Sequence, residues 1–339
     1  MRSYRFDDLT GLESLRLHEE DLPTPQRGEL LLRVLAVALN YRDIAMLHGT
    51  YPRPPEKGLI PVSDAAAEVV AVGEGVEDVA VGDRVVSVFH PRWFGGPLPA
   101  AQAARSYGVG RDGWLTEYKV VSQEAVVALP RGLSAVEAAT LPCAAVTARN
   151  ALAGPTPVRA GHTVLTLGSG GVSVFALQLA RAVGTRVIAT TSSPAKAARL
   201  RELGADDVVD YASDPGWGCT VRELTGGRGV DRVVEVGGPA TIAQSLAAVA
   251  SGGEITLVGF LGTGGAGIDY VDLLRATASV RSVSVGDRVA LQEVVRVVAT
   301  TGLRPVVDRV FGFHDAPAAF AHLESGRHLG KIVISVHPD

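Results

Sequence analysis

The feature that most constrains the fold is an alternation of short apolar runs and helical segments across the middle of the chain. Six runs have the length and composition of buried strands: 163–167, 186–190, 207–210, 231–236, 254–258 and 280–285. Strands that alternate with helices form a parallel sheet with helices on both faces. The sequence therefore predicts an α/β fold with a doubly wound parallel sheet of the Rossmann type over residues 126–286.

A glycine-rich turn follows the first of these runs and opens a predicted helix. It consists of Gly168, Ser169, Gly170, Gly171 and Val172. Glycines let the backbone approach a pyrophosphate, whose charge is stabilised by free amides at a helix N-terminus. Ser173 stands where the full dinucleotide fingerprint has Gly or Ala, so an ordinary strand-to-helix turn is the alternative. The position of the turn in the series favours dinucleotide binding.

The end of the second strand bears on the choice of cofactor. An NAD site would hold a carboxylate there for the ribose 2′-hydroxyl, and the sequence has none. Polar and basic residues are present instead: Thr191, Ser192, Ser193 and Lys196. They could hold a 2′-phosphate, which favours NADP(H). The alternative is that Ser193 only caps a helix that begins at Pro194, with Lys196 solvated.

The remaining segments predict a second, discontinuous domain. Short strands at 29–39, 66–72 and 85–89, joined by turns, indicate a mostly antiparallel, barrel-like unit within residues 1–125. A tail over 287–339, with one helix at 291–300 and strands at 306–311 and 331–336, is expected to fold back onto it. Residues 90–113 have little secondary-structure signal and are expected to form a functional loop.

Composition excludes several classes of protein. The formal net charge is −4 with both signs interspersed, so the chain lacks a basic nucleic-acid surface. No apolar run approaches the ~20 residues of a membrane span, and the first residues do not resemble a signal peptide, so a cytoplasmic location is expected. Two cysteines, Cys143 and Cys219, cannot form a disulfide scaffold or a four-cysteine zinc site.

The chain resembles the medium-chain dehydrogenase/reductase superfamily along nearly its whole length. The motifs that carry the resemblance lie at 39–43, 60–73, 81–85, 139–143, the glycine turn and 330–333. They are most similar to the zinc-independent quinone oxidoreductase branch and to alcohol dehydrogenase-like proteins. The resemblance implies a split, partly open, barrel-like (GroES-like) catalytic domain around a dinucleotide-binding middle.

The resemblance also allows a test for zinc. Zinc-dependent relatives hold the catalytic metal with Cys, His and Cys, and the matching positions here are Asn40, Ser63 and Cys143. Because one thiol cannot replace three protein ligands, no metal is expected. Asp43 and Asp64 match positions that support the metal in those enzymes, and hydrogen bonding to neighbouring loops is the expected role here.

Without a metal, hydrogen-bond donors must stabilise charge on the substrate oxygen. Tyr41 is the first candidate because a phenol stays protonated at neutral pH, and Asn40 beside it can supply amide contacts. The matching pair in relatives lies by the nicotinamide. A half-buried tyrosine at the end of a strand is the alternative for Tyr41.

Further residues are expected along the cofactor and the substrate. Thr147 should face the cofactor as the matching family position does, unless its hydroxyl only bonds a helix carbonyl. Strand ends at Gly237, Gly259, Phe260 and Val285 should line the cofactor track. The loop residues His90, Trp93 and Phe94 are candidates for substrate contact, with simple packing as the alternative.

The leading hypothesis is an NADPH-dependent, zinc-independent oxidoreductase that transfers hydride to a quinone, an enone or a similar activated double bond. The first alternative is an NADP(H)-dependent alcohol or carbonyl dehydrogenase without zinc. The second is a non-catalytic NADPH-binding protein of the zeta-crystallin kind. A homodimer is expected because the strand at 280–285 leaves an edge that could pair with a second copy.

Overall fold

The alternating segment forms a six-stranded parallel sheet, as predicted. The strands are β8 (Thr163–Leu167), β9 (Arg186–Thr191), β10 (Asp207–Asp210), β11 (Val230–Glu235), β12 (Val249–Leu257) and β13 (Ser279–Ser282). Their order is β10-β9-β8-β11-β12-β13, and every neighbouring pair is parallel. All five residues of β8 are buried, which fits a central strand covered on both faces.

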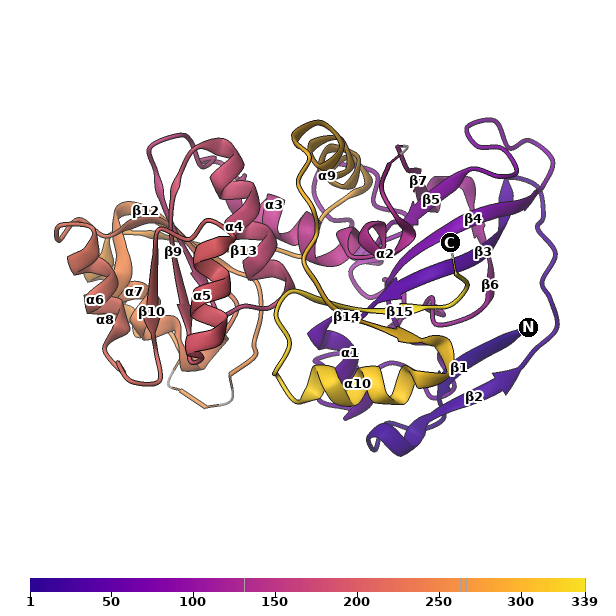
Figure 1. Cartoon of the computed structure of the whole chain (residues 1–339), viewed down its shortest axis with the longest axis horizontal. Coiled ribbons are helices and arrows are strands. Elements are labelled where there is room, and N and C mark those ends of the chain that lie inside the picture. The colour runs from indigo at the N-terminus through magenta and orange to yellow at the C-terminus, as the bar shows by residue number, and fades with distance from the viewer. Residues whose placement is uncertain (131, 263, 266, 339) are drawn as a thin grey trace. The chain divides into compact units, whose positions relative to one another are not determined.

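Helices fill the connections between these strands (Figure 1). They are α4 (Gly171–Val183), α5 (Pro194–Glu202), α6 (Trp217–Leu224), α7 (Ile242–Ala248) and α8 (Tyr270–Ala276). The strand order reverses direction at β8, and right-handed crossovers therefore place α4 and α5 on one face and α6 and α7 on the other. The reversal also leaves a crevice at the carboxyl ends of β8 and β11, where ligands bind in such sheets.

A second sheet, mostly antiparallel, is built from two distant parts of the chain. Its order is β14-β15-β3-β4-β5-β7, and β6 also pairs with β3. The strands are β3 (Glu29–Ala38), β4 (Asp64–Val72), β5 (Arg84–Ser87), β6 (Tyr118–Ser122), β7 (Val126–Ala128), β14 (Val307–Gly312) and β15 (Lys331–Ser335). The pairing of β15 with β3 confirms that the tail returns to the first segment.

The structure describes residues 1–130, 132–262, 264–265 and 267–338, and it divides into two compact units. One contains 1–146 and 285–339, and the other contains 147–284. The first boundary therefore lies at 146/147, whereas the sequence placed it at 125/126. The physical reason is that β7 pairs with β5, and the chain through α2 (Ala135–Ala138) and the π-helical turn η4 (Leu141–Ala145) stays with that sheet.

Helices complete the unit that contains the mixed sheet. They are α1 (Tyr41–Leu47), α9 (Arg288–Thr301) and α10 (Ala316–Glu324), while α3 (Val146–Leu152) leads into the other unit. The tail was expected to hold one helix, and α10 is a second one, which packs against α1 (Figure 1). Its Phe320 is buried against Phe6 of β1. Residues 90–113 form a loop with one short 3₁₀ turn, η2 (Ala100–Gln102).

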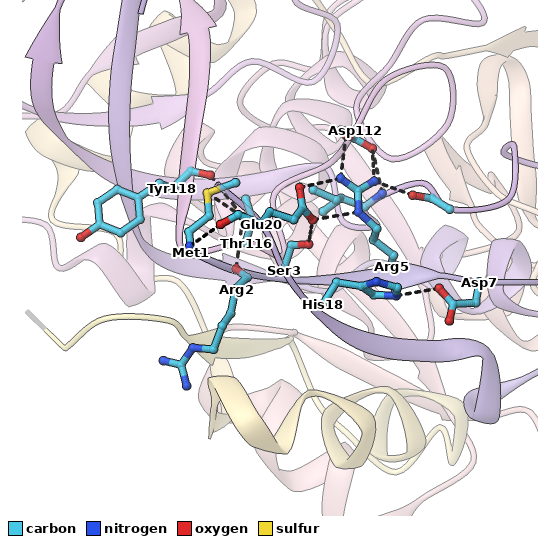
Figure 2. A network of polar contacts seen from close by, with 12 residues as sticks. Met1, Arg2, Ser3, Arg5, Asp7, His18, Glu20, Asp112, Thr116 and Tyr118 are labelled. Carbon is cyan, nitrogen blue, oxygen red and sulfur yellow. Dashed lines mark hydrogen bonds and ion pairs between the residues drawn. The ribbon is translucent and has the colours of Figure 1, made fainter. Parts of the chain in front are cut away.

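Two short strands at the N-terminal segment were not predicted: β1 (Arg2–Phe6) and β2 (Leu15–Glu19). A polar network fastens them to the rest of the unit (Figure 2). Arg5 pairs with Glu20 through Nε and Nη2 at 2.8 and 2.9 Å, and its Nη1 donates to the Gly58 carbonyl. Asp112 accepts from the Ile60 amide at 3.0 Å and lies 3.4 Å from Arg5 Nη1. The network thus joins three separate chain segments.

Short 3₁₀ turns occupy Leu12–Ser14, Gln123–Ala125, Gly238–Ala240 and Phe313–Asp315. In the part of the chain that the structure describes, none of the helices has the length and apolar character needed to cross a membrane.

Candidate active site

The glycine turn after β8 has the geometry of a phosphate cradle. Gly168 has a φ of +71°, and Gly170 is the N-cap of α4, a helix of 13 residues. A Cβ built on either glycine meets nothing within 4 Å, so open space lies where a side chain would project. Backbone and space therefore fit a pyrophosphate at the helix N-terminus.

Ser173, the departure from the fingerprint, is turned inward. Its Oγ donates to the Leu167 carbonyl at 2.6 Å, and the residue is buried. The hydroxyl therefore stabilises the strand-to-helix turn, and the departure leaves the cradle intact.

The end of β9 carries the polar residues proposed for a 2′-phosphate. Ser193 is the N-cap of α5 and accepts from the Lys196 amide at 3.4 Å, so its capping role is observed. Thr191 is buried and Ser192 is exposed. Asp210 is the register partner of Thr191 on β10, and its Oδ1 accepts from the Ala212 amide at 2.9 Å. Capping does not exclude phosphate binding, because the same helix end favours an anion.

A buried carboxylate that sequence reasoning missed shapes the end of β11. Glu235 is fully buried, and its Oε1 accepts from the amides of Gly237 and Gly238 at 2.7 and 2.9 Å. Thr241 Oγ1 donates to the same oxygen at 2.5 Å, and Ser245 Oγ donates to Oε2. The carboxylate thus fixes the Gly237 turn on the strand next to β8. Its sequence signal was an acid at a strand end followed by hydroxyls four residues apart.

The remaining predicted cofactor residues lie on several different segments of the chain. A Cβ on Gly259 would come 2.7 Å from the Val236 carbonyl, so this glycine is required by close packing. Phe260 after it is exposed, and Thr147 is buried in α3. Val285 has a φ of +48° and belongs to the unit that contains the mixed sheet, whereas the other cofactor candidates lie in 147–284.

The second candidate region is a buried polar cluster where β3 ends. Asn40 is the N-cap of α1, and its backbone N–H donates to Asp43 Oδ2 at 2.8 Å. Tyr41 is the first residue of α1 and is 42% exposed. It therefore begins a helix and does not finish a strand, and its chemical role stays a prediction.

Residues from three other segments complete the cluster. Asp64, at the start of β4, accepts from Ser63 Oγ at 2.6 Å and from the Cys143 amide at 3.0 Å. Lys331, at the start of β15, donates from Nζ to the Leu39 carbonyl at 2.5 Å and to Asn40 Oδ1 at 2.6 Å. Lys331 was set aside as a surface lysine, yet only 3% of it is exposed.

Burial controls the protonation of this cluster. It raises the pKa of Asp43 to about 6, against the opposing charge of Arg42. It also raises the pKa of Asp64, an effect that the Lys331 charge opposes. Burial raises the pKa of the Cys143 thiol to about 12, and the charge of Asp64 adds to this. The thiol is therefore protonated at neutral pH.

These donors do not fit a zinc ion. A zinc ligand must be a thiolate, an imidazole or a carboxylate, and of Asn40, Ser63 and Cys143 only Cys143 can supply one, which leaves the site short of the three protein ligands needed. The Asn40 oxygen and the Ser63 hydroxyl are already engaged with Lys331 and Asp64. No group of three or more His, Cys, Asp or Glu suited to a metal occurs among the described residues.

The loop residues proposed for substrate contact differ in exposure. His90 and Trp93 are buried, with ring centroids 5.7 Å apart, and Trp93 Nε1 donates to the Gly96 carbonyl at 2.9 Å. Phe94 is 44% exposed. Burial lowers the pKa of His90 to about 4, helped by the charge of Arg42. Burial fits the packing alternative for His90 and Trp93, although both ring nitrogens of His90 are buried without a hydrogen-bond partner among the described residues. Phe94 presents its ring to solvent, and substrate contact by the three residues stays a prediction.

Arg42 is a buried residue that the motif contained and the sequence reasoning passed over. Its guanidinium carbon lies 4.5 Å from the Phe89 ring centroid, and its Nη2 donates to Ser106 Oγ at 3.1 Å. Within the described part of the chain, its Nε and Nη1 have no hydrogen-bond partner. The cluster therefore contains two buried cationic side chains, Arg42 and Lys331.

Known proteins are similar to this chain over nearly its whole length. Residues 26–131 match the family model of the alcohol dehydrogenase GroES-like domain, and residues 171–300 match that of the zinc-binding dehydrogenases. A zinc-type alcohol dehydrogenase-like protein of Schizosaccharomyces pombe is 36% identical over 337 residues, which cover 97% of each chain. A solved structure from Sinorhizobium meliloti 1021 is 38% identical, with a TM-score of 0.91 and coverage of 99% of this chain and 98% of that one.

Other relatives differ in cofactor and substrate. A solved NAD-dependent alcohol dehydrogenase is 32% identical with a TM-score of 0.91, and a mycobacterial protein solved with NADPH is 28% identical with a TM-score of 0.83. These two structures cover 99% of this chain, which covers 100% of each. A chloroplastic quinone oxidoreductase of Triphysaria versicolor is 29% identical over 98% of each chain. By fold, family models and full-length similarity, this chain is an oxidoreductase that belongs to the medium-chain dehydrogenase/reductase superfamily.

Proposed function

We propose that the protein is an NADP(H)-dependent oxidoreductase that transfers hydride to a quinone, an enone or a similar activated double bond without zinc. The observation that carries this proposal is the buried cluster at the end of β3, where an amide, a hydroxyl and a protonated thiol stand at the positions of zinc ligands. Without a metal ion, such a cluster would stabilise charge on a substrate oxygen through hydrogen-bond donors.

A bound nicotinamide would supply the hydride, which adds to the electron-poor carbon while an electron pair moves onto the substrate oxygen. Tyr41 has an exposed side chain at the start of α1, and its phenol would donate to that oxygen. The Asn40 amide would provide a second donor. The carbon next to the carbonyl then takes a proton from solvent, which completes the reduction of an enone.

The preference for NADP(H) is supported by the end of β9. Ser192 and Ser193 provide hydroxyls at a helix N-terminus, and Lys196 lies in the first turn of α5. Asp210, at the end of the neighbouring strand β10, accepts a hydrogen bond from the Ala212 amide in the turn that follows that strand. The mycobacterial relative solved with NADPH also supports this choice, whereas the NAD-dependent relative is a reason to measure both cofactors.

The second candidate function is the interconversion of an alcohol with an aldehyde or ketone. The alcohol dehydrogenase names of the similar proteins favour it. Alcohol oxidation needs a base, and the two nearby histidines suit that role poorly. His48 Nε2 lies 2.6 Å from Glu324 Oε1, and His90 is buried. We therefore place this function second.

We further propose a small-molecule substrate, a cytoplasmic location and a homodimer formed through β13, which is an edge strand of the parallel sheet. A non-catalytic NADPH-binding protein is the outcome to be expected if no substrate is turned over.

The test is the oxidation of NADPH and of NADH by quinones, enones and ketones, with and without a strong chelator. Tyr41→Phe should lower kcat by about 10- to 100-fold, since one donor to the substrate oxygen is lost, and should leave the Kd of NADPH within twofold. Tyr270→Phe, on the exposed face of α8, is the matched control and should not change kcat. Equal losses of turnover and NADPH binding in Tyr41→Phe would contradict the chemical role, and loss of activity with a chelator would contradict zinc independence.

A further inference from the structure

Lys331 is the feature of the cluster that the proposed reaction does not yet use. It is the first residue of β15, and the antiparallel pairing of β15 with β3 brings it to the place where β3 ends and α1 begins. Its Nζ contacts two oxygens, the Leu39 carbonyl at 2.5 Å and Asn40 Oδ1 at 2.6 Å. A lysine is rarely buried this deeply unless it has such partners.

The contact with Asn40 fixes which way the amide faces. An ammonium has three donors and no acceptor, so it can bond only the oxygen of the amide and never its NH₂ group. The amide oxygen therefore points to Lys331, and Nδ2 points away from it. The backbone of Asn40 is held as well, because its N–H donates to Asp43 Oδ2 at 2.8 Å. Both ends of the residue are thus constrained.

The Nδ2 group retains a donor. It is buried, and the described residues provide it with no hydrogen-bond partner. The amide lies close enough to Asp64 to lower the pKa of that carboxyl, whose oxygens already accept from Ser63 Oγ and the Cys143 amide. Because an NH₂ group carries two hydrogens, at most one can face Asp64, and the other has no partner among the described residues.

Charge is the second contribution of Lys331. Asp43 and Asp64 are both fully buried, and a negative oxygen forming beside them would be repelled. Lys331 acts electrostatically on both carboxyls and favours their charged forms, against burial. The ammonium thus supplies positive charge beside two buried carboxyl groups.

We infer that Lys331 is a positioning residue: its ammonium holds the Asn40 oxygen so that the Asn40 Nδ2 group is presented as a donor to the substrate oxygen. This inference rests on the proposed function, since it assigns a use to the amide in hydride transfer. It adds a residue that acts through Asn40 and need not touch the substrate itself.

The experiment is a double-mutant cycle between Lys331 and Asn40. Lys331→Met and Asn40→Ala should each lower kcat by about 100-fold, the loss typical of one donor to a developing oxyanion, with the Kd of NADPH within twofold. In the Asn40→Ala background, Lys331→Met should lower kcat further by less than about threefold, because the group that it positions is already absent. Independent, multiplicative losses would overturn the inference, as would full activity of Lys331→Met.

Two further substitutions separate orientation from charge. Lys331→Gln keeps an N–H donor without the charge, and Lys331→Arg keeps both. Lys331→Arg should recover kcat to within about tenfold of the wild type, and Lys331→Gln should lie between Lys331→Arg and Lys331→Met. A Lys331→Gln enzyme no better than Lys331→Met would contradict positioning by a hydrogen bond. These variants also serve if Lys331→Met fails to fold.

The matched control is Lys119→Met. Lys119 donates from Nζ to the Asp112 carbonyl at 2.8 Å and lies over the rings of Tyr107 and Trp114. None of these partners belongs to the cluster. Its loss should lower stability without the selective loss of kcat.

A stability cycle on the same variants keeps the two proposals distinguishable. The Lys331–Asn40 contact predicts that the effects of Lys331→Met and Asn40→Ala on the urea unfolding midpoint are not additive. Non-additive midpoints in a protein with no hydride transfer would overturn the proposed function and leave the contact standing. Additive midpoints in an active enzyme would overturn the positioning role alone.

Discussion

At the scale of single residues, Gly168 shows how backbone conformation and ligand space constrain one position together. Its φ of +71° is a conformation that residues with a Cβ rarely adopt, and a Cβ there would project into open space. Gly161, before β8, has a φ of +84° and equally open surroundings but lies away from the cradle. Both glycines therefore adopt a positive φ, but only Gly168 lies at the proposed phosphate site.

This pair gives a prediction for cofactor binding. Gly168→Ala and Gly161→Ala should each lower the free energy of unfolding by about 1 kcal/mol, the cost of a left-handed alanine. Gly168→Ala should also raise the Kd of NADPH by about tenfold or more, because the methyl group occupies the place of the pyrophosphate. Titration of NADPH fluorescence and urea unfolding check the two effects. Equal Kd values for the two variants would show that the phosphates bind elsewhere.

Residues also mark the limit of what the sequence predicts about the site. Asn40, Tyr41 and the glycine turn could be identified because motifs with fixed local spacing carry them. Arg42 and Lys331 lie in such motifs too, but their burial, which gives them their importance, is created only by the tertiary structure. Glu235 carried a weaker signal, an acid at a strand end followed by hydroxyls. The local sequence around a strand lysine is the same whether its side chain is exposed or buried.

At the scale of secondary-structure elements, a buried ion cluster joins three neighbouring strands of the parallel sheet. Arg232 on β11 and Arg281 on β13 both contact Glu254 Oε1 on β12, at 3.1 and 2.8 Å. Arg232 Nη2 also donates to the Thr156 carbonyl at 2.5 Å, so the cluster reaches the segment after α3. Removing Glu254 would leave two guanidinium groups without their carboxylate.

We predict that Glu254→Gln lowers the free energy of unfolding by about 3–5 kcal/mol, the usual cost of breaking a buried ion pair. Glu202→Gln is the matched control, since Glu202 pairs with Arg199 on the exposed face of α5 and should change stability by less than about 1 kcal/mol. Urea denaturation followed by circular dichroism measures both. A change below 1 kcal/mol in Glu254→Gln would mean that the arginines find other partners.

The buried strands of the parallel sheet were predicted better than the helices of 270–276 and 316–324. The strand β8 matches its predicted bounds because every residue in it is buried. The helix α8 was missed, and none of its residues is buried, although it carries apolar residues such as Val271 and Leu274, which are exposed. The helix α10 did carry an apolar stripe, since its buried residues Ala316, Ala319, Phe320 and Leu323 have helical spacing.

At the scale of the whole molecule, the order of domains followed from the sequence, whereas the first boundary did not. The change from antiparallel to alternating pattern lies near residue 126, but strand pairing keeps residues 126–146 with the mixed sheet. Local patterns show which element a residue belongs to. They do not show which sheet that element joins.

Assembly is the prediction that belongs to this scale. The edge of the parallel sheet at β13 is unpaired in the described part of the chain, and its residues are only partly covered. Two-fold pairing there would join the sheets of two copies. Analytical ultracentrifugation should therefore give twice the chain mass of 35.3 kDa. A species of one chain mass at micromolar concentration would contradict the dimer.

The contact between Lys331 and Asn40 also has a consequence for biosynthesis. The two residues are separated by 291 positions in the sequence. A ribosome therefore adds the buried carboxyl groups of Asp43 and Asp64 long before it adds the ammonium of Lys331. A nascent polypeptide that has reached only the nucleotide-binding unit has Arg42 but not yet Lys331 beside these carboxyl groups, and their burial is then less favourable. The pairing of β15 with β3 brings this last charge to the pocket, so we expect the pocket to be complete only once the C-terminal strand has docked.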